Sequence, residues 1–325
     1  MRASSTRRAF AVAMALCGAH AAAFAQDASA YPSQPLRIVV PYPAGGATDT
    51  LARLIATKLQ ESWRQTVVVE NKPGASGTIG NDLVAKAPRD GHTILLGITA
   101  LVQVPSLMPK LPYDVLKDLQ PLVQVASTNS VFLVPASSPA GTLKEFVASA
   151  KANPGKHSYG SYGIGTSSHI QGSLLNLQAG VDLIHVPYKG AAPLLQDLRG
   201  GQLSSAFIDM ATARPHLDSM KALAVTGPQR NKALPNVPTF AELGYQSFEP
   251  VGWFGLFMPT GVEAPIAAKF IAEASRIVHL PDVVARIESL GMTPGELKGD
   301  EFARVVKSDA AVYARIIKDA NIRLE

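Results

Sequence analysis

The stretch IVVPYPAGGATDTLARLIATKL, from Ile38 to Leu59, changes from strand to turn to helix within one short segment. Its apolar start predicts a buried strand that ends at Tyr42. A turn of small residues follows, and we expect a helix to begin near Thr48 or Asp49. A strand followed at once by a helix is typical of α/β proteins. The helix would bury one face, formed by Leu51, Leu54, Ile55 and Leu59.

The same alternation of short apolar runs and helical patterns continues along much of the chain. It predicts an α/β fold whose strands are buried on both faces. The last third differs, because after Val251–Met258 the sequence is almost wholly helical. We expect Asp300 to cap the final helix. The predicted strands are 36–42, 66–70, 93–98, 119–126, 131–135, 183–188, 203–209 and 223–226.

The first 25 residues have the three parts of an export signal. Arg2, Arg7 and Arg8 precede the apolar run 9–17, and Ala-Phe-Ala at 23–25 marks the expected cleavage site. The general secretory and twin-arginine routes both remain open, since Arg7-Arg8 fits the second. The single cysteine, Cys17, lies within this segment. Disulfides, thiolate metal sites and a cysteine nucleophile are therefore not expected in the exported chain.

The remaining roughly 300 residues favour two domains rather than one. The helical last third must cover a sheet formed earlier in the chain. We therefore predict a discontinuous first domain, residues 26–125 plus 235–325, and a second domain over residues 126–234. Two crossings between them would form a hinge, with a ligand cleft between the domains.

Charge and motifs exclude several classes of function. Removing the three signal arginines from the formal net charge of +5 leaves +2, and no run rich in Lys and Arg follows. Nucleic acid is thus not an expected partner. The glycines at 163 and 165 do not belong to a dinucleotide fingerprint, and there is no Walker motif, no Gly-x-Ser-x-Gly and no paired spacing of histidines. We expect no cofactor, no metal and no catalytic residue.

The turn Pro43–Ala47 lies at the carboxyl end of a predicted strand, where ligands bind in open α/β sheets. A helix start offers unpaired backbone N–H groups and partial positive charge, so the site suits a carboxylate or a phosphate. An ordinary βα turn that uses glycine for its geometry is an equally open interpretation. The predicted contacts here are Tyr42, Ala44, Gly45, Gly46, Ala47, Thr48 and Asp49.

Two other segments, 72–78 and 163–169, have the same small, hydroxyl-bearing helix start. Either could instead carry an ordinary Ser or Thr helix cap. Tyr188 and Asp209 end two further strands, and Asp209 could equally bind a ligand or cap the next helix. The contacts predicted from these parts are Ser76, Gly77, Thr78, Gly165, Thr166, Ser167, His169, Tyr188 and Asp209.

Five motifs together resemble one family, in the order in which that family has them. They are 40–49 (VPYPAGGATD), 69–77 (VENKPGASG), 88–93 (PRDGHT), 185–190 (HVPYKG) and 234–239 (LPNVPT). The chain is similar over nearly its whole exported length to the periplasmic substrate-binding proteins of tripartite tricarboxylate transporters, the Bug or TctC family. Tyr42 and Ala47 depart from the Phe and the third glycine that relatives often have.

The resemblance implies a type II periplasmic-binding-protein fold whose two α/β domains close on a small carboxylate. The ligand would be a di- or tricarboxylate, an aromatic acid or an amino acid, held by the loops 42–49 and 165–169. We expect a periplasmic monomer that delivers this ligand to the permease subunits of a transporter. The alternatives are a ligand-sensing adaptor for a sensor kinase, or an exported serine hydrolase that uses Ser76 or Ser167 with His169.

Overall fold

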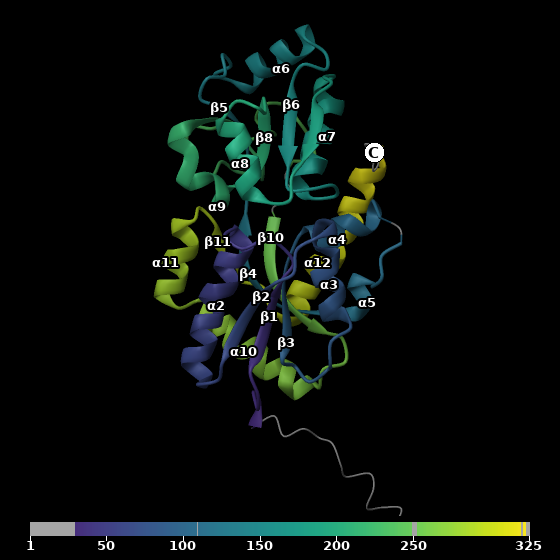
Figure 1. The fold of residues 1–325 in the computed structure, drawn as a ribbon, viewed down its shortest axis with the longest axis vertical. Coiled ribbons are helices and arrows are strands. Elements are labelled where there is room, and N and C mark those ends of the chain that lie inside the picture. Colours follow the sequence, from purple (N-terminus) through teal and green to yellow (C-terminus); the bar gives the residue numbers. More distant parts are fainter. Residues whose placement is uncertain (1–29, 109, 249–251, 320, 323–325) are drawn as a thin grey trace, which may run out of the picture.

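The computed structural model describes residues 30–108, 110–248, 252–319 and 321–322. The expected export signal lies outside these residues. The fold consists of two β-sheets, one above the other along the long axis of the molecule, with helices packed around each (Figure 1). The predicted α/β class is confirmed.

The first sheet has the strand order β11-β4-β10-β3-β1-β2. Strands β1, β2 and β3 are parallel, whereas β10 runs antiparallel to both β3 and β4. The sheet is therefore mixed rather than parallel. Its strands are β1 (Leu36–Val40), β2 (Val67–Asn71), β3 (Thr93–Ile98), β4 (Leu119–Thr128), β10 (Gly252–Pro259) and β11 (Thr293–Pro294). Its helices are α2 (Ala47–Trp63), α3 (Thr78–Ala85), α4 (Ala100–Gln103), α5 (Val115–Asp118), α10 (Ala264–Val278), α11 (Pro281–Ser289) and α12 (Gly299–Asp319).

The second sheet has the strand order β7-β6-β8-β5-β9. The strand β6 is parallel to β7 and β8, and β5 is antiparallel to β8 and β9. Its strands are β5 (Ser130–Pro135), β6 (Ser158–Ser161), β7 (Ile184–Pro187), β8 (Ser205–Asp209) and β9 (Met220–Val225). Its helices are α6 (Leu143–Ala152), α7 (Ser167–Ala179), α8 (Ala191–Arg199) and α9 (Met210–Ala213), followed by the 3₁₀ turn η4 (Arg214–Ser219).

The chain passes between the sheets twice, at Asn129 between β4 and β5 and again between β9 and β10. The two passages are hydrogen-bonded to each other. Asn129 Nδ2 donates to the Thr226 carbonyl, and Ser130 N donates to Thr226 Oγ1 over 2.8 Å. The chain thus leaves the first sheet after β4 and returns to it at β10, which is the path that a discontinuous first domain requires. The predicted domain limits at residues 125/126 and 234/235 stay a prediction.

Three local expectations were wrong. The strand β6 was not predicted, because its sequence SYGS has no apolar run. The final helix begins at Gly299, so Asp300 lies in its first turn rather than at its cap. The edge strands β2 and β7 are partly exposed and not buried on both faces.

Candidate functional site

A cavity of about 950 Å³ lies between the two sheets and takes its lining from both. The first sheet contributes the turn Pro43–Thr48, which we call the first jaw. The second sheet contributes residues of the loop Gly163–Ser168, which we call the second jaw. The predicted contacts that line the cavity are Tyr42, Ala44, Gly45, Gly46, Ala47, Thr48, Thr166, Ser167 and Asp209.

The first jaw is the start of helix α2. Gly46 is the N-cap residue, and no side chain caps this end of the helix. The N–H groups of Ala47, Thr48 and Asp49 have no acceptor among the described residues. They are available to an anion in the cavity. Gly45 has a φ of +89°, a conformation that favours glycine, so the turn needs this residue type there.

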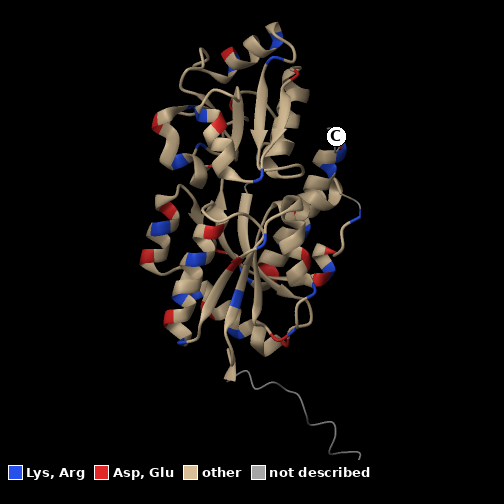
Figure 2. Cartoon of the chain, in the orientation of Figure 1, with Lys and Arg blue, Asp and Glu red and all other residues tan. Residues whose placement is uncertain are grey.

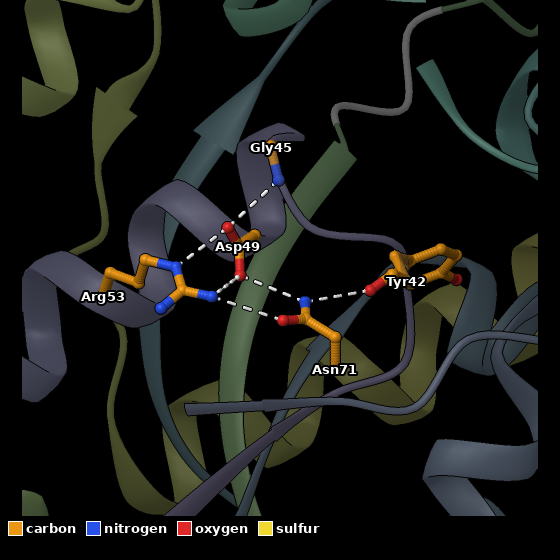
Figure 3. Close-up of polar contacts among 5 residues, drawn as sticks. All are labelled: Tyr42, Gly45, Asp49, Arg53 and Asn71. Carbon is orange, nitrogen blue, oxygen red and sulfur yellow. Dashed lines mark hydrogen bonds and ion pairs between the residues drawn. The ribbon is translucent and has the colours of Figure 1, made fainter. Parts of the chain in front are cut away.

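A charge network centred on the buried Asp49 carboxylate holds the first jaw from behind (Figure 3). Asp49 Oδ2 accepts hydrogen bonds from Gly45 N and Arg53 Nε, each over 3.0 Å. Asp49 Oδ1 accepts one from Asn71 Nδ2 over 3.0 Å, and Asn71 Nδ2 also donates to the Tyr42 carbonyl over 3.1 Å. The network ties the turn to strand β2.

Asp49 is only 4% exposed and does not line the cavity, so its expected contact with a ligand stays a prediction. Burial tends to raise the pKa of this carboxyl group. The hydrogen bonds that it accepts, first of all from Arg53, outweigh burial and hold the pKa below its usual value. Asp49 is therefore a carboxylate that orients the jaw.

The second jaw leads into helix α7, with Thr166 as its N-cap residue. Its hydrogen bonds join neutral groups. Thr166 Oγ1 donates to the Gly163 carbonyl over 2.7 Å, and Ser168 Oγ accepts from Tyr162 N over 3.1 Å. Thr166 and Ser168 are 2% and 3% exposed, although both line the cavity. These bonds fix the position of the α7 N-terminus.

Two histidines support the second jaw from behind. His169 Nδ1 accepts from Gly165 N over 3.2 Å, and its ring stacks on His185 with centroids 4.3 Å apart. His185 Nε2 lies 2.7 Å from Ser161 Oγ. Burial lowers the pKa of His185 to about 4, so this imidazole is neutral at neutral pH. Neither Gly165 nor His169 lines the cavity, and their expected ligand contacts stay predictions.

The third predicted helix start, at Ser76, Gly77 and Thr78, does not line the cavity. Ser76 Oγ instead donates to the Ile164 carbonyl over 2.5 Å. Tyr188 also lies outside the lining, and its hydroxyl donates to Asp197 Oδ2 over 2.6 Å. The structure thus brings two of the three helix starts together at one cavity.

Asp209 caps the next helix, as one of the two interpretations of its sequence context predicted, and its contact with a ligand stays a prediction. Its Oδ1 accepts from Thr212 N over 2.9 Å and so caps α9, while the residue also lines the cavity. Its Oδ2 accepts from the Tyr162 hydroxyl over 2.8 Å. Burial, and then the nearby Asp209 carboxylate, raise the pKa of Tyr162, which keeps this phenol protonated.

The sequence reasoning missed several lining residues. Thr128 ends β4 and Thr99 follows β3, so the ends of these strands were the available signal. Tyr162 follows β6, which was itself missed. Exposed cations also line the cavity, and none of them forms an ion pair with a described residue. The missed residues include Thr99, Thr128, Ser130, Tyr162, Trp253, Lys189, Arg199 and Arg286.

The hydroxyl groups required by the serine hydrolase alternative bond elsewhere. Ser167 Oγ donates to Gln103 Oε1 over 3.1 Å, and Ser76 donates to a backbone carbonyl. Within the described ranges, no three His, Cys, Asp or Glu side chains are grouped to hold a metal ion. No helix described here is long and apolar enough to cross a membrane.

Comparison with known proteins gives a consistent result. A family model described as "Tripartite tricarboxylate transporter family receptor" matches residues 51–322. The chain is 40% identical over 296 residues to a protein encoded in the tcbD-tcbE intergenic region of Pseudomonas sp. strain P51, covering 90% of this chain and 88% of that protein.

Two solved structures contain carboxylates. Rpa4515 of R. palustris with adipate has a TM-score of 0.86 at 30% identity, covering 90% of this chain and 99% of that one. MatC from Rhodopseudomonas palustris with bound malate has a TM-score of 0.83 at 31% identity, covering 88% of this chain and 100% of that one.

Proposed function

Because the chain belongs to the tripartite tricarboxylate transporter receptor family, we propose that it captures a small carboxylate and delivers it to the permease subunits of such a transporter. The ligand class we propose is a di- or tricarboxylate, an aromatic acid or an amino acid. One observation carries the proposal: two helix starts from two different sheets line the same cavity. Each offers N–H donors to an anion.

The chemistry of the jaws suits reversible capture. The donors near the α2 and α7 starts are backbone N–H and hydroxyl groups rather than charged side chains. A fully desolvated ion pair would be costly to separate again. Neutral donors can hold a carboxylate and still release it, as a transport receptor must.

We propose that the ligand acts by stabilising a closed arrangement of the two halves. Contacts to both jaws are possible only when the jaws face each other, so a ligand that uses both binds the closed form better. Such a ligand shifts the population toward that form. We further propose that residues 1–25 direct the chain to the periplasm and are then removed.

The sensing alternative uses the same cleft. A ligand-dependent adaptor would present its closed form to a sensor kinase instead of a permease. Affinity capture from membranes with and without ligand distinguishes the two, because the transport proposal requires permease subunits among the proteins that bind the closed form. Recovery of a sensor kinase without any permease would contradict it.

The binding proposal is tested by titration calorimetry against adipate, malate, citrate and an aromatic acid. Ala47→Pro is the sharpest variant. Ala47 is the first residue of α2, where proline is well tolerated, and Gly46 already has the extended conformation (φ −83°, ψ 176°) that a following proline requires. The substitution removes one N–H from the first jaw while leaving the helix intact.

We expect Ala47→Pro to weaken binding about tenfold without lowering the melting temperature. Ala47→Ser retains the N–H and is the matched control, expected within twofold of the wild type. If no carboxylate binds the wild type and none copurifies with it, the capture proposal fails.

A further inference from the structure

The second jaw contacts segments that pack on the first sheet, and these contacts lie outside the lining of the cleft. Gln103, at the end of α4, is fully buried and is not part of the cavity lining. Its Nε2 donates to Ser167 Oγ over 2.9 Å, and its Oε1 accepts from the same hydroxyl. The Gln103 side chain also interacts with the phenol of Tyr313 on α12, where it opposes the rise in pKa that burial causes. Gln103 therefore joins α12 and α4 to the start of α7.

A second contact reaches the same loop from the turn Gly74–Gly77. Ser76 Oγ donates to the Ile164 carbonyl within the second jaw. Ala75 and Ser76 have φ values of +47° and +54°, a left-handed conformation that is strained for residues other than glycine. Strain of this kind persists only where surrounding contacts maintain it. The strained turn is what directs Ser76 at the second jaw.

The glycines of the second jaw permit close approach to this surface. A Cβ added at Gly165 would lie 3.3 Å from Val104 Cγ2 and 3.4 Å from Leu107 Cδ1. One added at Gly163 would lie 3.4 Å from Ser76 Oγ. The loop is thus seated between the strained turn on one side and the segment Gln103–Leu107 on the other.

These contacts link parts of the chain that belong to different sheets. The Gln103–Ser167 bond spans 64 residues and the Ser76–Ile164 bond spans 88. The two passages between the sheets are elsewhere, at Asn129 and between β9 and β10. A movement that carries the second jaw away from Gln103 and from the turn Gly74–Gly77 breaks these bonds, whereas the hydrogen bonds within each jaw do not span the two sheets.

We infer that Gln103 is a positioning residue for ligand binding, which together with Ser76 latches the second jaw in the closed arrangement. It acts on the ligand through Ser167 and the α7 N-terminus, and does not touch the ligand itself. The inference rests on the proposed function in one respect, namely that closure serves capture. Its consequence is that the closed form has stabilising contacts of its own, independent of the ligand.

The test compares two variants, both of which lose the interaction between residues 103 and 313. Gln103→Met removes the hydrogen bonds to Ser167 and the interaction with Tyr313 while keeping a side chain of similar length. Tyr313→Phe removes only the interaction between residues 103 and 313, so it is the matched control. Closure is followed by energy transfer between dyes at Ala148→Cys on α6 and Ala272→Cys on α10, in a Cys17→Ser background. Both alanines are exposed, and α6 and α10 lie at opposite ends of the molecule (Figure 1).

Adipate and malate serve as probes, and release rates are measured by stopped flow. We expect Gln103→Met to release the bound probe about tenfold faster than the wild type, with a smaller closed fraction both with and without probe. Tyr313→Phe should stay within twofold of the wild type in both measurements. Ser76→Ala should shift both in the same direction as Gln103→Met by about threefold, and it provides the test if Gln103→Met does not fold.

The inference is overturned if Gln103→Met and Tyr313→Phe have equal release rates and equal closed fractions. It is also overturned if Ser76→Ala matches the wild type when Gln103→Met does not fold. A wild type that binds neither probe nor any other carboxylate contradicts the proposed function instead. In that case the closed fractions without probe still decide the inference, because the latch involves no ligand atom.

Discussion

The first jaw is held by charge and the second by neutral hydrogen bonds, although both are helix starts that line the same cleft. Behind the first jaw, the Asp49 carboxylate bonds to Gly45, Arg53 and Asn71, all within one sheet's side of the molecule (Figure 3). Behind the second, hydroxyl and imidazole groups connect the loop to β6 and β7, and Gln103 reaches it from the other sheet.

This difference gives the two jaws different tasks. The first is anchored to its own sheet and should keep its shape whether or not a ligand is bound. The second depends in part on contacts that exist only when the halves meet. Positions of Lys, Arg, Asp and Glu are scattered along the ribbon of both halves in Figure 2, and the two jaws themselves supply only uncharged residues to the cleft. We infer a preformed first jaw and a second jaw completed by closure.

We expect the largest effect on stability from a substitution that disrupts the first jaw. Asp49→Ala leaves Gly45 N without its acceptor and deprives Arg53 and Asn71 of theirs, so we expect a loss of about 3 kcal/mol in the free energy of unfolding. Urea denaturation measures it. Glu61→Ala on the same helix α2 removes an exposed ion pair with Lys58 and should leave the midpoint unchanged. Equal effects of the two substitutions would contradict a special role for the charge network.

A smaller effect is expected at the second jaw. Ser168→Ala removes the acceptor of Tyr162 N and a hydroxyl partner of Thr166, which should cost about 1–2 kcal/mol in the free energy of unfolding. Because no charge is involved, this loss should be the same in low and high salt. Ser289→Ala, which removes a bond to an exposed carbonyl, is the control. A strong salt dependence for Ser168→Ala would remove the contrast between the jaws.

The jaws should also differ in their response to pH. The folded pKa of His185 lies near 4, below its usual value of 6.5, so the unfolded chain binds more protons between these values. The stability associated with a neutral His185 imidazole is fully present above about pH 6.5 and is lost as the pH falls toward 4. The groups facing His185 are Ser161, Tyr159 and His169. Melting temperatures across this range should therefore decline less steeply for His185→Gln than for the wild type.

The contribution of Asp49 is lost at a lower pH. Its pKa is lowered in the folded protein, so its stabilisation is present above about pH 4 and disappears only as the pH falls through the folded value. In Asp49→Asn the additional decline below pH 4 should be absent, while the decline between pH 6.5 and 4 is retained. If His185→Gln and Asp49→Asn alter the same pH range, the assignment is wrong.

The smallest effect is expected for Arg53→Gln. The Arg53 side chain is 55% exposed, so water can replace much of the hydrogen bonding that the Asp49 carboxylate loses when Arg53 is substituted. We expect a small fall in melting temperature at low salt that shrinks further in high salt, because salt screens exposed charges. A fall as large as that of Asp49→Ala would mean that the ion pair, and not the bonds to Gly45 and Asn71, holds the jaw.

The sequence predicted the first jaw well because its strand, glycine turn and helix are local features with strong patterns. It did not separate the residues that face the cleft from those behind it. Asp49 is an acid in the first turn of a helix, and only the structure places Arg53 and Asn71 around its carboxylate. The helix start at Ser76 looked like the other two. Its direction depends on the left-handed turn at Ala75 and Ser76, for which no sequence pattern is specific.

The second jaw was harder to predict because its support is not local. Strand β6 has no apolar run, and Gln103 is an unremarkable polar residue until the fold buries it against Ser167. His169 was read as a ligand contact because it follows a glycine loop. Its Nδ1 accepts from the N–H of Gly165, which precedes helix α7, and its contact with a ligand stays a prediction.

A crystal structure with adipate or malate bound is the decisive measurement of whether both jaws hold the ligand. We predict one ligand carboxylate within hydrogen-bond distance of backbone N–H groups in both jaws, near Ala47 and near Ser167, with Gln103 still bonded to Ser167. A carboxylate held instead by Lys189, Arg199 or Arg286, with no contact to either jaw, would contradict it.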